Sequence, residues 1–395
     1  MSDVAIVGGG PGGLYAARQL AARGLTVSVF EEHLAPGKPV HCTGVLAAEA
    51  FDEFALRRDA ILNGLSTAEF FAPSGQSISY TTTRTEALVI DREKFDGMLG
   101  EDARAAGATV HIGERVTNVR VSAADVVIER AGAAPARAQV CILACGANYV
   151  LQRRLGLGMP GLHMQSAQAE LPCDRPGAVE LHFGSEVAPK GFAWVVPVVR
   201  GDQTFARVGL MCDHDARAFF TRFAERVAVR WQTRPIMCSA DTPVPRAKIL
   251  PLSPIPRTFG SRVVAVGDAA GLVKATTGGG IYYSLLSGRL AAEAIVAALK
   301  AGDAGQGGLA SYEKNWRAAL GDELDAQMKL RDIAQQLSDE DIDNLFHLAK
   351  TDGIMPLVRR TAQFNRHRDV IVALLSHPPA RRILMRRVLG WTRTA

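Results

Sequence analysis

The 395-residue sequence predicts an α/β fold with an α+β second lobe: a parallel-sheet domain, an inserted antiparallel sheet and a C-terminal helical region. Three observations predict it. The chain opens with a strand, a glycine-rich turn and a helix; apolar and polar residues alternate between Met164 and Leu210; and helical periodicity dominates after residue 300. The length also exceeds what one compact core supports, so we expect more than one lobe.

The N-terminal segment has the pattern of a Rossmann-like dinucleotide site. An apolar strand, Asp3–Val7, precedes a turn and then a helix over about 14–23. The turn contains Gly8, Gly10, Gly12 and Gly13. The first glycine allows a tight turn, the second lets a pyrophosphate approach the backbone, and the last lets helix and strand pack. The next strand, Thr26–Phe30, ends on Glu31, where a carboxylate can accept hydrogen bonds from an adenosine ribose.

A meander interrupts this domain. Residues 67–80 alternate apolar and polar around a turn, as in a β-hairpin, and a strand at Ala87–Ile90 follows. Asp91 is expected to cap a helix, with Arg92 in its first turn, where the guanidinium can stay in solvent or reach the cofactor phosphates. Further strands are expected at residues 108–112, 115–121, 126–129 and 139–144.

The antiparallel region contains an aromatic strand, Gly191–Pro197. Phe192, Trp194 and Val196 share one face because side chains alternate along a strand. Such a face suits an ordinary core or the roof of a site for an apolar ligand. A helix is expected next, over 213–230.

A second glycine-rich segment follows a buried strand at 262–266. Asp268 comes at the end of that strand, where a carboxylate can hold a sugar-like polyol. The run Thr276–Gly280 then precedes a helix over about 281–299, whose N-terminus offers free amides and partial positive charge to an electron-rich ring. Together the two motifs favour a bound dinucleotide with a sugar-like polyol and an electron-rich ring.

Cys42 lies in a loop of small residues that we expect at the carboxyl edge of the parallel sheet, where ligands of such sheets bind. By itself it could be a packed thiol. The six cysteines include no CxxC pair and no neighbouring histidine with ligand spacing, which argues against a metal site and against a disulfide framework.

Positive charge is concentrated at the C-terminus. Residues 359–395 hold nine arginines and one acid, Asp369. Arg381, Arg382, Arg386 and Arg387 are interleaved with Ile383, Leu384, Val388, Leu389 and Trp391. This pattern suits peripheral contact with an anionic membrane better than nucleic acid, because stacking aromatics are missing. Without an uninterrupted apolar span or a leader, we expect a cytoplasmic protein, with such contact at the inner face of the membrane.

With both glycine motifs in place, the chain resembles the geranylgeranyl reductase family, within the p-hydroxybenzoate-hydroxylase-like FAD enzymes. The resemblance extends over nearly the whole chain. It rests on HCTGVL around Cys42, DREKFD from Asp91, GFAWVVP from Gly191 and GDAAGLVKATTGGGIYYSLLSG from Gly267. It implies an FAD-dependent reductase that saturates carbon–carbon double bonds of an isoprenoid, lipid-like chain.

The resemblance also implies roles for single residues. Those placed around FAD are Gly8, Gly10, Gly12, Gly13, Glu31, Cys42, Thr43, Gly44, Arg92, Val116, Asp268, Gly279, Gly280 and Ile281. Phe192, Trp194 and Pro197 match the family's aromatic strand over the flavin and lipid tunnel. Cys42 matches the cysteine beside the flavin ring and is expected to be catalytic, delivering or relaying a proton.

One departure concerns the electron donor. Cys145–Tyr149 stands where related hydroxylases carry an Asp-Gly motif, which leaves NADPH and a small redox protein both open as donors. Two other functions also remain open: an FAD monooxygenase or halogenase acting on an aromatic or specialised metabolite, and a membrane-docked, lipid-binding electron-transfer flavoprotein. We expect an FAD-binding domain (1–65, 86–160 and 255–300), an antiparallel-sheet substrate domain (66–85 and 161–254) and a C-terminal helical region (301–395).

Overall fold

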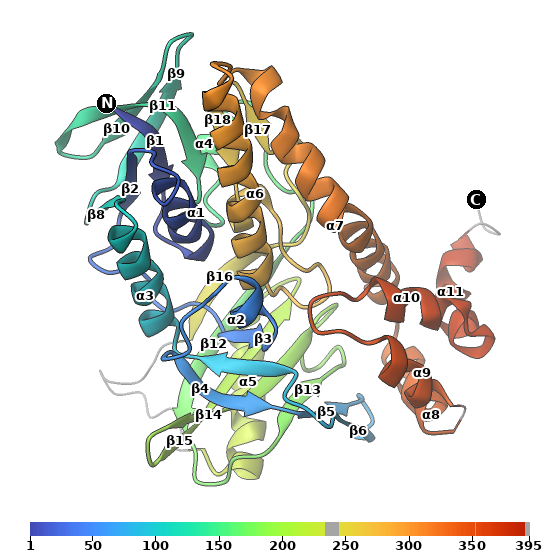
Figure 1. The fold of residues 1–395 in the computed structure, drawn as a ribbon. Coiled ribbons are helices and arrows are strands. Elements are labelled where there is room, and N and C mark those ends of the chain that lie inside the picture. The colour runs from blue at the N-terminus through green and yellow to red at the C-terminus, as the bar shows by residue number, and fades with distance from the viewer. Residues whose placement is uncertain (234–244, 352, 392–395) are drawn as a thin grey trace.

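The computed structural model describes residues 1–233, 245–351 and 353–391, with side chains as far as residue 386. It confirms the mixed α/β class: Figure 1 shows a parallel sheet with its helices at one end, an antiparallel sheet at the other, and the C-terminal helices as a separate red group. The tail positions Arg387, Val388, Leu389 and Trp391 lie outside the described side chains.

The first sheet has eight strands, and its parallel part follows the order β18-β11-β1-β2-β8. The strands of this sheet are β1 (Ser2–Val7), β2 (Val27–Glu31), β8 (Thr109–Ile112), β9 (Val116–Val121), β10 (Val126–Arg130), β11 (Ala133–Leu143), β17 (Phe259–Gly260) and β18 (Val263–Ala265). β11 is longer than the predicted 139–144 because its first half pairs antiparallel with β10.

Helices pack against this sheet and bury its apolar residues. They are α1 (Pro11–Ala21), α3 (Arg92–Ala105), α6 (Ile281–Lys300) and the long α7 (Gln306–Ala334), with the short α4 (Val150–Arg154) and the 3-10 turn η1 (Gly267–Ala270). The short α2 (Ala50–Glu53) contacts α3 through the rings of Phe51 and Phe95. The predicted N-cap of α3 is confirmed, because the Asp91 carboxylate accepts a hydrogen bond from the Lys94 amide at 3.1 Å.

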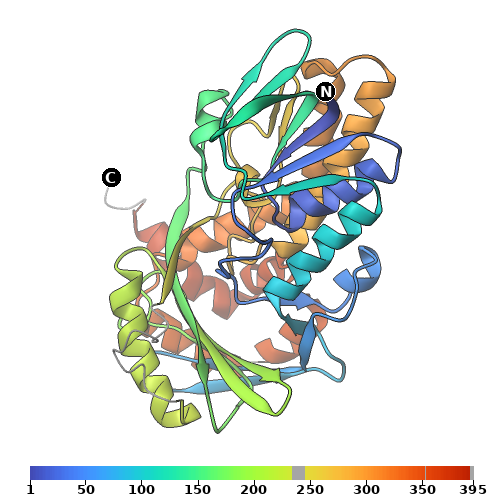
Figure 2. The same cartoon turned by 90° about the vertical axis from the view of Figure 1, so that its left-hand side faces the viewer.

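The second sheet has seven strands in the order β16-β12-β15-β14-β13-β5-β6, and Figure 2 shows it as a layer below the parallel sheet. Its strands are β5 (Thr67–Phe71), β6 (Ser77–Thr81), β12 (His163–Pro172), β13 (Val179–His182), β14 (Phe192–Arg200), β15 (Gln203–Cys212) and β16 (Arg246–Pro251). One face packs on α5 (Ala216–Trp231), which begins three residues later than predicted. The predicted hairpin at 67–80 is β5 and β6.

A three-stranded sheet lies between the two layers. It contains β3 (Val45–Ala47), β7 (Ala87–Ile90) and β4 (Ile61–Leu65). The C-terminal helices are α8 (Asp339–Thr351), α9 (Ile354–Thr361), α10 (Arg368–Ser376) and α11 (Pro378–Trp391). None of the helices in the described ranges combines the length and the apolar character needed to cross a bilayer.

The close crossing of α1 and α6 depends on glycine. A Cβ atom on Gly288 would lie 2.5 Å from the backbone oxygen of Gly12, and a Cβ on Gly12 would lie 2.8 Å from that of Ser284. We therefore expect Gly288→Ala to lower the free energy of unfolding by about 1–3 kcal/mol, the usual cost of overpacking. Denaturant unfolding measures this.

Gly97→Ala is the matched control, because Gly97 is inside α3 and a Cβ atom there would have nothing within 4 Å of it. Removing a helical glycine there should stabilise the protein by up to about 1 kcal/mol. Equal stability of the two variants would contradict the proposed contact.

Candidate active site

A cavity of about 1020 Å³ lies between the parallel sheet and the antiparallel sheet. Its walls include the turn after β1, the loop that carries Cys42, the start of α6 and the cavity-facing side of β14. The predicted residues that line it are Gly8, Gly10, Gly12, Gly13, Glu31, Cys42, Thr43, Gly44, Arg92, Val116, Phe192, Trp194, Asp268, Gly279, Gly280 and Ile281. The fold thus brings together residues that are far apart in the sequence.

The turn between β1 and α1 requires glycine. Gly8 has a φ of +106°, and a Cβ there would lie 2.3 Å from the Ala144 oxygen. A Cβ on Gly13 would lie 2.4 Å from the Gly8 oxygen. The backbone at Gly10 faces open space, and α1 has no side-chain cap. The first amides of α1 are therefore available to an anionic group such as a pyrophosphate.

Glu31 is buried at the end of β2. One carboxylate oxygen accepts from the Gly9 amide at 2.6 Å and the other accepts from the His33 amide at 2.9 Å. Glu31 therefore ties the glycine turn to the second strand. That Glu31 also accepts hydrogen bonds from an adenosine ribose remains a prediction.

Asp268 lies at the start of η1, directly after β18. One carboxylate oxygen accepts from Lys248 Nζ at 3.0 Å, and the other would lie 2.8 Å from a Cβ atom on Gly280. The Asp268 charge raises the pKa of Lys248 above its usual value, although burial opposes this. A larger residue at position 280 would displace the carboxylate, so the position of the Asp268 side chain depends on the glycine.

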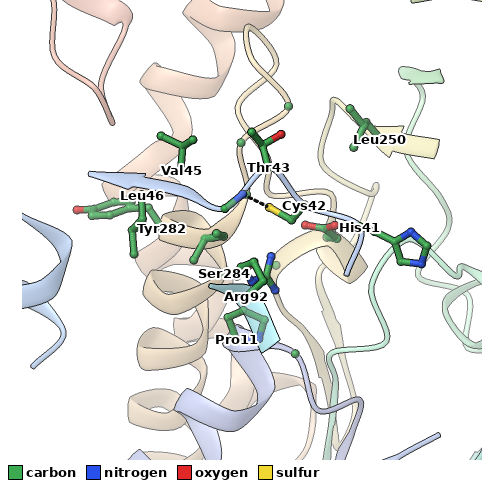
Figure 3. Close-up of a pocket in the computed structure, with 18 of the residues that line it drawn as sticks. Pro11, His41, Cys42, Thr43, Val45, Leu46, Arg92, Leu250, Tyr282 and Ser284 are labelled. Atoms are coloured by element: carbon green, nitrogen blue, oxygen red, sulfur yellow. Dashed lines mark hydrogen bonds between the residues drawn. The ribbon is translucent and has the colours of Figure 1, made fainter. Parts of the chain in front are cut away.

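The Cys42 loop runs across the cavity (Figure 3). The Gly44 amide donates to Cys42 Sγ at 3.4 Å. The loop is anchored from β15, because the buried Arg207 guanidinium donates to the Thr43 oxygen at 2.6 Å and to the Ile90 oxygen at 3.0 Å. A Cβ on Gly44 would lie 2.7 Å from that guanidinium, so glycine is needed at this point too.

Arg92 projects from the start of α3 toward Cys42 (Figure 3). Its guanidinium pairs with the buried Asp96 carboxylate at 2.7 Å. Burial acts to lower the pKa of Arg92, but the charges of Asp96 and of an ionised Cys42 raise it above its ordinary value. A fixed cation therefore lies beside the cysteine.

The segment that leads into α6 is held from α7 and from the loop between α9 and α10. Arg331 on α7 donates to the Thr276 oxygen at 3.0 Å, and the buried Lys274 ammonium donates to the Phe364 oxygen at 2.7 Å. Burial lowers the pKa of Lys274 to about 7. As at α1, no side chain caps α6, so its first amides are also available to a ligand.

The apolar end of the cavity is formed by β14 and its neighbours. Phe192 and Trp194 line it and their rings lie 5.7 Å apart. Gly209 on β15 leaves the space for the indole, because a Cβ there would lie 2.5 Å from it. Pro197 does not line the cavity: it is an odd number of residues from Trp194 and so lies on the opposite face of the strand.

Sequence reasoning missed Lys248, Arg207, Asp96 and Lys274. Of these, only Asp96 carried a local signal, as the fourth residue after Arg92 on one helix. The others depend on which strands and loops meet in three dimensions.

The family model described as an FAD binding domain matches residues 1–325. The digeranylgeranylglycerophospholipid reductase of Methanosphaerula palustris is 31% identical over 375 residues, which cover 88% of this chain and 90% of that protein. The enzyme of the same name from Methanocaldococcus jannaschii is 29% identical, covering 87% and 89%.

Solved structures show the same fold. A geranylgeranyl bacteriochlorophyll reductase-like protein from Thermoplasma acidophilum superposes with a TM-score of 0.83 at 24% identity, covering 98% of each chain. A flavin-dependent brominase superposes with a TM-score of 0.69 at 16% identity, covering 100% of each chain.

Proposed function

The chain belongs to the geranylgeranyl reductase family of FAD-dependent oxidoreductases, and we propose that it saturates carbon–carbon double bonds of an isoprenoid chain. The observation that carries this proposal is that the glycine turns and Asp268 line the same cavity as the apolar side chains of Phe192 and Trp194.

The polar end of the cavity fits FAD. Two helices, α1 and α6, point uncapped N-termini at it, and the backbone at Gly10 leaves open space. The amides of α1 would hold the pyrophosphate, Glu31 the adenosine ribose, Val116 the adenine and Asp268 the ribityl chain. When bound and reduced, FAD supplies the hydride.

The apolar end fits a hydrocarbon chain. Leu65, Phe70, Leu181 and Val196 extend the wall formed by Phe192 and Trp194. Each methylene buried there contributes roughly 0.8 kcal/mol, so a prenyl chain can bind without polar partners. The protein's task is then to hold one double bond in position and to supply a proton.

We assign the proton to Cys42. Reduced FAD, when bound, would supply the hydride that one carbon of the double bond receives, and the Cys42 thiol would give its proton to the other carbon. The resulting thiolate lies beside the Arg92 cation and accepts from the Gly44 amide.

The proposal is tested by incubating the FAD-loaded protein with dithionite and a geranylgeranyl-type lipid without oxygen. The product should gain the mass of two hydrogens for each double bond reduced. Halogenated or hydroxylated products formed in air with bromide or an aromatic acceptor, and an unchanged lipid, would instead favour the monooxygenase or halogenase alternative.

We further propose that residues 66–85 and 161–254 act as the substrate domain, and that the C-terminal helices dock on the anionic inner face of a membrane. Val358 on α9 lines the cavity, and the exposed Arg359 and Arg360 follow it directly. Cationic side chains of the same helix therefore lie near the cavity, and a bilayer held by them would be close to the lipid site.

On α11, Arg381 and Arg382 are exposed, whereas Leu384 is buried against the protein and Arg386 pairs with Asp341 at 3.3 Å. We expect Arg381→Glu/Arg382→Glu to weaken binding to anionic vesicles by at least about thirtyfold, since each basic residue contributes about 1 kcal/mol at such a surface. Liposome flotation measures this.

Arg222→Glu/Arg226→Glu, which changes the same charge on exposed positions of α5, should bind like the parent protein. Equal recovery of the parent with neutral and anionic vesicles would refute membrane docking.

A further inference from the structure

A second cavity, of about 710 Å³, adjoins the first at the Cys42 loop. Val40, His41, Cys42, Arg92 and Gln168 line both cavities. We call the second one the arginine cavity, because its walls include Arg92, Arg200, Arg207, Arg217 and Arg246. Its size lies within the range of ligand pockets, about 300–1,000 Å³.

Three of these arginines are neutralised by carboxylates. Arg92 pairs with Asp96; Arg200 pairs with Asp91 and, at 2.9 Å, with Glu170; and Arg207 pairs with Glu170 at 2.6 Å. Burial acts to raise the pKa of Glu170, but the two arginines hold it below its usual value. Three carboxylates thus balance three guanidinium groups.

The other two arginines of the cavity are Arg217 and Arg246. Both are exposed, and neither has a carboxylate partner among the described residues. Arg246 is opposite Gln168 in the β12–β16 ladder, so both side chains lie on the face of the sheet that borders the cavities. Burial lowers the pKa of the neighbouring His41, and the charges of Lys248 and Arg246 lower it further.

We propose that the arginine cavity binds a phosphate group of a ligand that reacts at the neighbouring flavin site, with Arg217 and Arg246 as its cationic partners. The two surplus charges match a phosphate monoester, which carries nearly two negative charges at pH 7. Guanidinium groups also match the geometry of phosphate oxygens.

Two kinds of ligand that fit the proposed reaction carry such a group. One is an isoprenoid with a phosphorylated head, whose chain would extend past Cys42 into the apolar cavity. The other is a nicotinamide dinucleotide donor with a 2′-phosphate, which would approach the flavin from this side. The identity of the ligand rests on the proposed function, whereas the phosphate preference does not.

The test uses calorimetric titration of the protein loaded with oxidised FAD. One matched pair of probes is geranylgeranyl monophosphate and geranylgeraniol, and the other is NADP⁺ and NAD⁺. In one pair the phosphorylated member should bind the parent protein about tenfold or more tightly, as expected for charge-assisted hydrogen bonds. A preference in the lipid pair identifies the head group, and one in the nucleotide pair identifies the donor.

Arg217→Ala/Arg246→Ala should bring that ratio close to one, and Arg217→Gln/Arg246→Gln, which keeps most of the side-chain length, should do the same. Arg222→Ala/Arg226→Ala removes the same number of exposed guanidinium groups from α5 and should keep the parent ratio. A parent ratio near one in both pairs, or an unchanged ratio in the Arg217/Arg246 variants, would overturn the proposal. No double bond is reduced in these titrations, so failure of the proposed reaction would leave their outcome unaffected.

Discussion

Replacing Cys42 with alanine is expected to slow the reduction of a prenyl substrate by about 10²–10⁴-fold, the usual effect of losing a positioned general acid. The variant should still fold and bind FAD. The structural reason is the position of the thiol in the cavity wall, where it accepts from the Gly44 amide and has the Arg92 cation beside it. Cys42→Ser should also be slow, because a hydroxyl gives up its proton far less readily than a thiol.

The measurement is single-turnover oxidation of the reduced, FAD-loaded variant by a prenyl substrate without oxygen, expressed per bound flavin. Cys173→Ala is the matched control, because Cys173 is buried in the separate core of the antiparallel sheet. That variant should lose stability but keep the parent rate. Equal rates in the parent and in Cys42→Ala would return Cys42 to the role of a packed thiol.

The second large effect is expected at Asp268. Asp268→Ala should weaken FAD binding by about 10–150-fold, because losing one charged hydrogen-bond partner costs about 1.5–3 kcal/mol. The substitution also leaves the Lys248 ammonium in the cavity without its 3.0 Å partner. Flavin absorbance after gel filtration and titration of the apoprotein with FAD both measure this loss.

Asp202→Ala, in the exposed turn between β14 and β15, provides the control and should retain full flavin content. Undiminished FAD in Asp268→Ala would refute the placement of the ribityl chain. Lys248→Met should also bind FAD less tightly if that lysine helps to hold the Asp268 carboxylate in place.

The parts of the molecule that sequence reasoning predicted well are those set by local signals. The glycine turn after β1 follows from spacing, since the backbone contacts at Gly8 and Gly13 exclude any side chain. The cap at Asp91 and the hairpin at β5 and β6 likewise depend on neighbouring residues.

What the sequence could not predict depends on strand pairing. Lys248 reaches Asp268 only because β16 pairs with β12, and Arg207 reaches the Cys42 loop only because β15 is the next strand in that sheet. Pro197 was expected in the cavity wall, and the structure does not place it there. It belongs to the same motif as Trp194, but the alternation of side chains along β14 turns it away from the cavity.

We propose that reduced flavin bound in this cavity transfers hydride to an isoprenoid double bond. Anaerobic mixing of the reduced, FAD-loaded protein with a geranylgeranyl lipid tests it most directly. The flavin absorbance should return to the oxidised form in step with a product that carries two added hydrogens, one double bond for each flavin oxidised. A flavin that stays reduced with the lipid, yet is oxidised at once by oxygen, would contradict the claim.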